Sequence, residues 1–265
     1  MNDFFRGEKL YGDDLSLEQI KIWFEEEEEA YANMYGVKEE SSSHGFDFIN
    51  ELYGYKYIRK IPSFKKALGF GSSWGYEFLP IIDKIEELNI IEPSSQTISE
   101  ELGKIKPVYS KPELSGAISF PDNTFDLICA FSVLHHIPNV SFVLQELIRV
   151  LKPGGRFLLR EPIISMGDWR EERIGLTKNE RGIPEKIFTN ILKNNNIQVI
   201  EKHYLFTMTP FFRRSFNSKF FSSKTYYLFD KYFSKTLAFN IHYHAKNKLE
   251  RCAPQSIFYV LNKLN

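Results

Sequence analysis

Two adjacent histidines, His135 and His136, lie in a short segment between two apolar stretches. An imidazole titrates near neutral pH and can take a proton from an acceptor group. Two carboxylates, Glu161 and Asp168, follow along the chain and can orient an acceptor or accept its proton. The catalytic candidates are therefore His136, His135, Glu161 and Asp168. A structural hydrogen bond within the loop is the alternative role for one of the histidines.

A second group of residues has the composition of a nucleotide site. The small residues of Gly69-Phe70-Gly71-Ser72 allow a tight turn and a close approach of the backbone to a ligand. A helix expected from Tyr76 to about Asp83 would point its N-terminus at the same spot. Glu92 follows Gly71 by 21 residues, at the end of an expected strand. An acid there commonly accepts hydrogen bonds from the two ribose hydroxyls of a nucleotide.

The spacing of apolar residues places both groups on a parallel sheet. Residues 125–131 read as a buried strand, and 132–138 as the loop that carries the histidines. The next helix has 3.6-residue spacing, with Asn139 or Ser141 as its cap and Pro153-Gly154-Gly155 as its end. A strand over 156–160 completes a βαβ unit. Ligands of such sheets bind beyond the carboxyl ends of the strands, where the histidine loop and Glu161 lie.

Further strands are expected at 65–70, 87–91 and 107–110, and the first 60 residues are expected to be helical. Ser16 and Gln19 form a capping box, so a helix can run to about Met34. The run Glu25 to Glu29 on it is interpreted as a solvated face rather than a metal site. A second helix is expected over about 46–57. Residues 1–60 are interpreted as a lid or substrate segment that precedes a domain over 61–265.

The composition is that of an ordinary globular protein, with 43% hydrophobic and 26% charged residues and a formal net charge of zero. Nothing in these totals favours nucleic acid as a partner. Two cysteines are too few for a disulfide framework or a zinc site, no transmembrane segment or secretory signal is evident, and we expect a cytoplasmic protein without a bound metal. The charge is uneven, because residues 1–60 hold 14 acidic and 7 basic side chains and residues 202–251 hold 2 and 10.

The glycine turn, Glu92 and the run FPDNTFDLICAFSVLHHIP…ELIRVLKPGGRFLLREP resemble a class I S-adenosylmethionine-dependent methyltransferase of the methyltransferase type 11 kind, over roughly residues 64–163. The resemblance implies an α/β, Rossmann-like, seven-stranded, mostly parallel sheet with helices on both faces. Its last two strands, 197–206 and 256–264, would form an antiparallel hairpin with a helical cap inserted at about 207–255. S-adenosylmethionine would be the cofactor, and the residues implied to bind it are Gly69, Phe70, Gly71, Ser72, Glu92, Pro93, Ala117, Ile118, Phe131 and Ser132.

Three positions depart from that family's pattern. Ala67 stands where an acid usually precedes the turn, Ser73 stands where a third glycine is usual, and residues 114–118 lack the acid that often binds the adenine amino group. Glu92 is therefore expected to be the main charged anchor of the cofactor.

Two other stretches are expected to determine which acceptor is bound. Residues 163–183 form a polar loop in which Trp169 is either a packing residue or part of a functional loop. The cap interleaves aromatics with Arg213, Arg214, Lys219, Lys224 and Lys231, which fits either a self-packed helical cap or a surface for an anionic acceptor, with membrane attachment as a lesser alternative. His203, His242 and His244 also lie in this part, without the spacing of metal ligands.

The sequence thus predicts an enzyme that methylates a small polar molecule. The expected acceptor is an oxygen of a phosphorylated, nucleotide-linked or sugar-type metabolite. One alternative is a non-catalytic cofactor-binding module with a degenerate site, suggested by Ala67 and Ser73. The other is a nicotinamide-dependent oxidoreductase, which is disfavoured because Trp74 occupies the sixth position of G-x-G-x-x-G.

Overall fold

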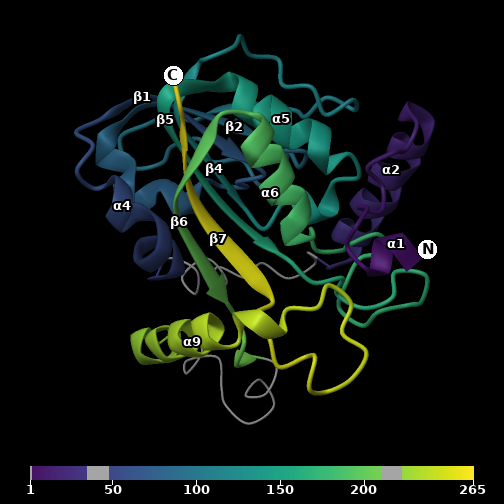
Figure 1. The fold of residues 1–265 in the computed structure, drawn as a ribbon. Coiled ribbons are helices and arrows are strands. Elements are labelled where there is room, and N and C mark those ends of the chain that lie inside the picture. The colour runs from purple at the N-terminus through teal and green to yellow at the C-terminus, as the bar shows by residue number, and fades with distance from the viewer. Residues whose placement is uncertain (1, 35–47, 210–222) are drawn as a thin grey trace.

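The computed structural model describes residues 2–34, 48–209 and 223–265. A seven-stranded sheet in the order β3-β2-β1-β4-β5-β7-β6 runs through its centre (Figure 1). The strands are β1 (Phe64–Phe70), β2 (Ile85–Ile91), β3 (Val108–Ser110), β4 (Phe125–Phe131), β5 (Leu151–Pro162), β6 (Ile197–Leu205) and β7 (Ser256–Lys263). The first five pair in parallel, and β7 runs antiparallel to both β5 and β6. The predicted fold class is confirmed.

The register brings the ends of four parallel strands to one edge of the sheet. Phe70 of β1 pairs with Ile91 of β2, and Phe131 of β4 pairs with Arg160 of β5. We call this side of the sheet the carboxyl edge. It lies at the lower side of Figure 1, where the segments that follow these strands gather.

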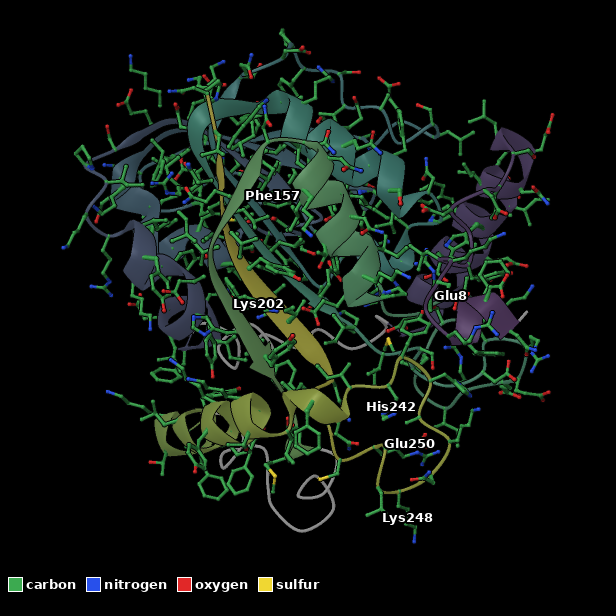
Figure 2. All side chains as sticks on the ribbon, viewed as in Figure 1. Glu8, Phe157, Lys202, His242, Lys248 and Glu250 are labelled. Carbon is green, nitrogen blue, oxygen red and sulfur yellow. The ribbon has the colours of Figure 1, made fainter. Side chains whose placement is uncertain are left out.

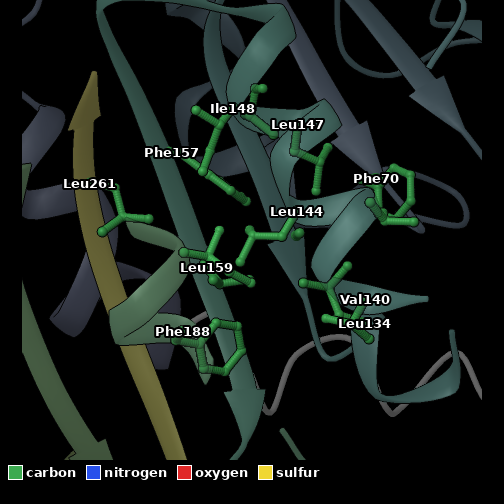
Figure 3. Close-up of a cluster of buried hydrophobic side chains, with 14 of the residues drawn as sticks. Phe70, Leu134, Val140, Leu144, Leu147, Ile148, Phe157, Leu159, Phe188 and Leu261 are labelled. Atoms are coloured by element: carbon green, nitrogen blue, oxygen red, sulfur yellow. The ribbon is translucent and has the colours of Figure 1, made fainter. Parts of the chain in front are cut away.

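Helices cover both faces of the sheet. On one face, α5 (Val140–Val150) and α6 (Glu185–Asn194) bury apolar side chains against β4, β5 and β7. Figure 3 shows Leu144 and Ile148 of α5 packed against Phe157 of β5 in this layer. The other face is covered by the π-helix η1 (Glu51–Tyr55), α4 (Lys56–Ile58), the 3-10 helix η2 (Tyr76–Lys84) and α9 (Lys224–Thr236).

The first 60 residues divide between the two sides of the molecule. α1 (Asn2–Phe5) and α2 (Leu17–Met34) lie together at one side of the sheet in Figure 1, whereas η1 and α4 pack on the opposite face from α5. The predicted capping box of α2 is present, because Ser16 N donates to Gln19 Oε1 at 2.9 Å and Gln19 N donates to Ser16 Oγ at 3.4 Å. The helix also extends to Met34, as predicted.

Several predicted elements differ from the structure. The helix after the glycine turn is a 3-10 helix, since Pro80 removes a backbone donor from its interior. The expected end of α5 at Pro153-Gly154-Gly155 is wrong, because α5 ends at Val150 and β5 begins at once. The pairing explains this: Phe125 faces Leu151 but Leu127 faces Arg156, so the Pro-Gly-Gly stretch bulges out of the strand.

Asn139 occupies the N-cap position of α5, one of the two predicted, but its side chain makes no capping hydrogen bond. Ser141 N donates to Oδ1 of Asp13 at 2.8 Å. The helix predicted over 46–57 is the π-helix η1 followed by the short α4, with residues 46 and 47 outside the described part.

The insertion between β6 and β7 is helical over part of its described residues. It contains α9 and the 3-10 helix η4 (Ala238–Asn240), and a long loop follows that carries His242, Lys248 and Glu250 (Figure 2). Residues 210–222, which include the predicted cap residues Arg213, Arg214 and Lys219, lie outside the described residues.

Candidate active site

The glycine turn, residues 69–73, lies at the carboxyl edge directly after β1. Gly71 has φ +65° and Ser73 has φ +45°, so the chain reverses through left-handed conformations. A Cβ added to Gly71 would lie 2.2 Å from Cγ2 of Val133, which is in the histidine loop, and one added to Gly69 would lie 2.5 Å from Oγ of Ser72. A side chain at either position would collide with a neighbouring group, so glycine is required at both. At Gly71 that neighbour is Val133, so the glycine turn lies against the histidine loop.

Glu92 follows β2 and turns back onto the glycine turn. Its Oε2 accepts a hydrogen bond from Ser73 N at 2.9 Å, its Oε1 accepts one from Ser94 N at 3.1 Å, and the residue is buried. Two backbone donors hold the carboxylate beside the turn, which is the position that a ribose-binding acid needs.

A second acid, Glu77 at the start of η2, faces the same turn and was not predicted. Burial raises the pKa of its carboxyl to about 7, against the opposing charge of Arg160. The Ser72 hydroxyl close to it is buried and makes no hydrogen bond of ordinary geometry to a described residue. A buried hydroxyl close to a carboxyl and two glycines fits a turn that a polar ligand can approach. Glu77 has no position in the motif expected from the sequence, so its spacing gave no signal that it would lie at the turn.

The other residues implied to bind the cofactor spread along the carboxyl edge. Phe70 is buried beneath the turn, Phe131 is the last residue of β4, and Ser132 follows it and donates its N–H to Arg160 O at 2.7 Å. Pro93 is exposed after Glu92. Ala117 and Ile118 lie after β3, and the Ile118 side chain is buried in the core next to α5.

Glu161 fixes the histidine loop. The residue is fully buried at the end of β5, and its Oε1 accepts hydrogen bonds from Val133 N and Leu134 N, both at 2.8 Å. Its Oε2 lies 2.7 Å from Nδ1 of His135. With three partners already in place, this carboxylate orients the loop.

The two histidines have different electrostatic surroundings. Burial alone would lower the pKa of His135, but hydrogen bonds and charge from Glu161 and Glu180 outweigh it and raise the pKa to about 9. The pKa of His136 is lowered, first by burial and then by the charge of His135. At neutral pH the first ring is therefore a cation, and the second is neutral and able to accept a proton.

Asp168, the fourth catalytic candidate, makes its hydrogen bonds with Arg170 and not with the histidine loop among the described residues. It is paired with Arg170, and hydrogen bonding to that guanidinium holds the pKa of its carboxyl at about 2. Nearby Trp169 is buried and stacks on Tyr11 at 5.3 Å between ring centroids, which fits its interpretation as a packing residue.

Three side chains missed in the sequence complete the surroundings of the histidine loop: Glu27, Glu180 and Arg181. Oε2 of Glu27, on α2, lies 3.1 Å from Nδ1 of His136. The interpretation of Glu25 to Glu29 as a solvated face is wrong for Glu27, which is 4% exposed. Ile20, Trp23 and Glu27 share one buried face of α2, and that i, i+3, i+7 spacing was the available signal.

Arg181 holds the loop to the N-terminal segment. Its side chain is fully buried, and its guanidinium donates hydrogen bonds to the carbonyls of Tyr11, His135, Ile137 and Pro138 at 2.8 to 2.9 Å. Trp23 Nε1 adds a hydrogen bond to His136 O at 2.8 Å. Segments more than 100 residues apart in sequence are thus joined by hydrogen bonds around the histidine loop.

Comparison with known proteins agrees with this architecture. Residues 68–159 match the model of a family described as a methyltransferase domain. The chain is 34% identical over 74 residues to a demethylmenaquinone methyltransferase from Geobacillus, a match over 28% of this chain and 30% of that protein. It is 42% identical over 53 residues to a sterol 4-C-methyltransferase from Caenorhabditis elegans, over 20% of this chain and 16% of that protein. The chain thus covers less than a third of the length of either relative.

Solved structures share the fold. An S-adenosylmethionine-dependent methyltransferase from Mesorhizobium loti superimposes with a TM-score of 0.52 at 11% identity, over 79% of this chain and 97% of that one. Together with the matched residues, this likeness identifies a class I S-adenosylmethionine-dependent methyltransferase domain in the chain, with S-adenosylmethionine as the cofactor of that domain. None of the helices in the described residues is long and apolar enough to cross a membrane.

Proposed function

We propose that the whole chain transfers the methyl group of S-adenosylmethionine to a small-molecule acceptor bound against the histidine loop. The observation that carries this proposal is the contact between the glycine turn and that loop, where Val133 lies against Gly71. A cofactor held on the turn and an acceptor held on the loop would be neighbours, as an in-line displacement requires.

On the cofactor side, three groups have distinct roles in the proposal. The backbone of the glycine turn approaches the cofactor, and Glu92 accepts hydrogen bonds from its ribose hydroxyls. Glu77 pairs with its ammonium group, in place of the acid that is missing at Ala67. When bound, the cofactor supplies a methyl group made electrophilic by its sulfonium.

On the acceptor side, the reacting group is proposed to be a hydroxyl that loses its proton as the new oxygen–carbon bond forms and the sulfur–carbon bond breaks. His136 supports this loss because its pKa is lowered and because, at 18% side-chain exposure, it is less buried than His135 or Glu161. Glu27, Glu161 and Glu180 surround the histidines, so the reacting end of the acceptor is proposed to carry no phosphate. A phosphate or nucleotide group of the acceptor, as expected from the sequence, remains a prediction, and such a group would lie away from the reacting end.

Methylation at carbon is the second candidate. The names of similar proteins favour it, since one is a sterol 4-C-methyltransferase and another is a ubiquinone/menaquinone biosynthesis C-methyltransferase. A phenol or enol acceptor that loses its proton can react at oxygen or at the neighbouring carbon. Identification of the product by mass spectrometry and NMR separates the two.

The first test is calorimetry of the full chain with S-adenosylmethionine. We expect Glu92→Gln to weaken binding by about tenfold or more, since a charge-assisted pair of hydrogen bonds is lost. Exposed Glu100→Gln is the matched control and should bind as the wild type does. Absence of binding by the wild type, or binding that Glu92→Gln leaves unchanged, would refute the cofactor assignment.

The second test is turnover against phenols, enols, sugars and phosphorylated metabolites, followed by release of S-adenosylhomocysteine. Binding of the cofactor without turnover of any acceptor class would favour the non-catalytic module. Binding of NAD in place of S-adenosylmethionine would favour the oxidoreductase.

A further inference from the structure

Two imidazoles and a carboxylate converge beside the histidine loop. One potential ligand atom from each of His135, His136 and Glu180 lies within 4.8 Å of the other two. His135 Nε2 lies 3.5 Å from Oε1 of Glu180. This is the only such group of three or more histidine, cysteine, aspartate or glutamate side chains in residues 2–34, 48–209 and 223–265.

Each of the three side chains is oriented by a further group behind it. Nδ1 of His135 lies on Glu161, and Nδ1 of His136 lies on Glu27, so the outer nitrogen of each ring has a carboxylate partner. Glu180 Oε2 accepts a hydrogen bond from Thr177 N at 3.1 Å, while Oε1 faces His135. Carboxylate–imidazole pairs of this kind fix the tautomer and direction of histidines that bind metal ions.

The charges around the cluster favour a cation. Three buried carboxylates, Glu27, Glu161 and Glu180, surround two histidines. Arg173 and Arg181 lie nearby but do not pair directly with these carboxylates, because their guanidiniums donate hydrogen bonds to backbone carbonyls. Oε1 of Glu27 is buried and has no hydrogen-bond partner among the described residues, although burial of an unpaired carboxylate oxygen is costly.

We propose that His135, His136 and Glu180 bind one divalent transition-metal ion of the Zn²⁺ type, with Glu161 and Glu27 as the carboxylates that orient the two imidazoles. Imidazole nitrogen with a single carboxylate oxygen suits Zn²⁺, Co²⁺ or Fe²⁺ and does not suit Ca²⁺ or Mg²⁺, which prefer oxygen ligands. Three protein ligands leave a coordination position open, which is typical of catalytic rather than structural zinc sites.

The distances are close to those that such an ion needs. Bonds of about 2.0–2.2 Å in tetrahedral geometry place neighbouring ligand atoms about 3.4 Å apart. The 3.5 Å between His135 and Glu180 fits without movement. The remaining pairs, at up to 4.8 Å, need a contraction of little more than about 1 Å, which is within reach of side-chain rotation.

The role of the ion rests on the proposed function, but its binding does not. At the open position the ion would hold an acceptor oxygen and lower the pKa of its hydroxyl, so that the proton would pass to solvent. His136 would then support the loss of the proton as a ligand of the ion, in place of accepting the proton itself.

The direct test is titration of the tag-free, chelator-treated full chain with Co²⁺, followed by calorimetry and by the visible absorption of the bound ion. We expect one ion per chain, and at least tenfold weaker binding by Glu180→Gln and by His136→Gln. His242→Gln, on the exposed loop of Figure 2, is the matched control and should bind as the wild type does. Absence of saturable binding by the wild type, or full affinity in Glu180→Gln, would overturn the proposal.

A measurement on the wild type covers the case in which a variant fails to fold. In ¹⁵N NMR of the histidine side chains, one equivalent of Zn²⁺ should shift the ring nitrogens of two of the six histidines. Shifts confined to the signals of His242 and His244, or no shift, would contradict the site. Because S-adenosylmethionine binding is measured separately, failure of the metal site and failure of the proposed function give different results.

Discussion

The glycine turn and the histidine loop face each other across the carboxyl edge, yet they are stabilised in opposite ways. The turn is local: its carboxylate, Glu92, holds Ser73 from 19 residues away, and Gly71 N donates to Ile91 O. The loop is held by Glu161 of β5 and, in addition, from far along the chain, by Glu27 at 109 residues and by Arg181 through Tyr11 at 170 residues. The proposed cofactor side is thus built by the sheet alone, whereas the proposed acceptor side also needs segments added around the sheet.

The largest expected effect is loss of the buried carboxylate behind the loop. In the presence of a chelator, Glu161→Gln should lower the free energy of unfolding by roughly 3–5 kcal/mol, because a charged acceptor of three hydrogen bonds becomes a neutral amide. Urea denaturation measures this change. Exposed Glu172→Gln is the control, with an expected change near zero. A loss below about 1 kcal/mol for Glu161→Gln would mean that the loop does not depend on this residue.

A smaller effect should appear where the two regions touch. Gly71→Ala meets Val133 and also adopts a positive φ, so we expect a loss of roughly 2–4 kcal/mol in unfolding free energy. Gly154→Ala is the matched control: it has φ +77° and nothing within 4 Å, so it should lose only about 1 kcal/mol.

Val133→Ala added to Gly71→Ala should restore part of the difference, because it removes the methyl group that clashes. Equal losses for the two glycines, or no rescue, would argue that the turn and the loop are not in contact.

The smallest expected effect is a pH dependence on the cofactor side alone. Burial raises the pKa of Glu77 to about 7, so its carboxyl is mostly neutral below that pH and becomes ionised above it. If the carboxylate pairs with the cofactor ammonium, affinity for S-adenosylmethionine should increase severalfold between about pH 6 and pH 7.5. Calorimetry across this range measures it. Glu77→Gln should bind more weakly with a flatter profile, and an unchanged profile in that variant would remove Glu77 from the site.

Sequence patterns were sufficient to predict the elements that are determined by residues close together in the sequence. The strands around Gly69, the helix with Leu144 and Leu147, and the capping box at Ser16 all follow from local spacing. The bulge at the start of β5 did not, because Pro153-Gly154-Gly155 has the composition of a turn and only pairing with β4 keeps it within a strand.

The site divides in the same way. Gly71 and Glu92 could be predicted because their spacing along two adjacent strands sets their positions. Glu180 and Arg181 could not, because their positions depend on long-range packing, and for Glu27 the helical spacing shows only that its face of α2 is buried and not which residues it contacts. Glu27 was the most misleading, since the acids around it suggest solvent while its own helical face is buried.

Arg181 and Trp23 have a consequence for how such a protein can diversify. Both donate hydrogen bonds to the histidine loop, and both lie in sequence outside residues 68–159, the stretch that matches the methyltransferase domain. Substitutions in the flanking segments can therefore change the surroundings of the histidine loop while the sheet and the glycine turn stay as they are. Two proteins that share this domain need not share a substrate. Similarity of the flanking segments is a better guide to similarity of substrate than similarity of the domain itself.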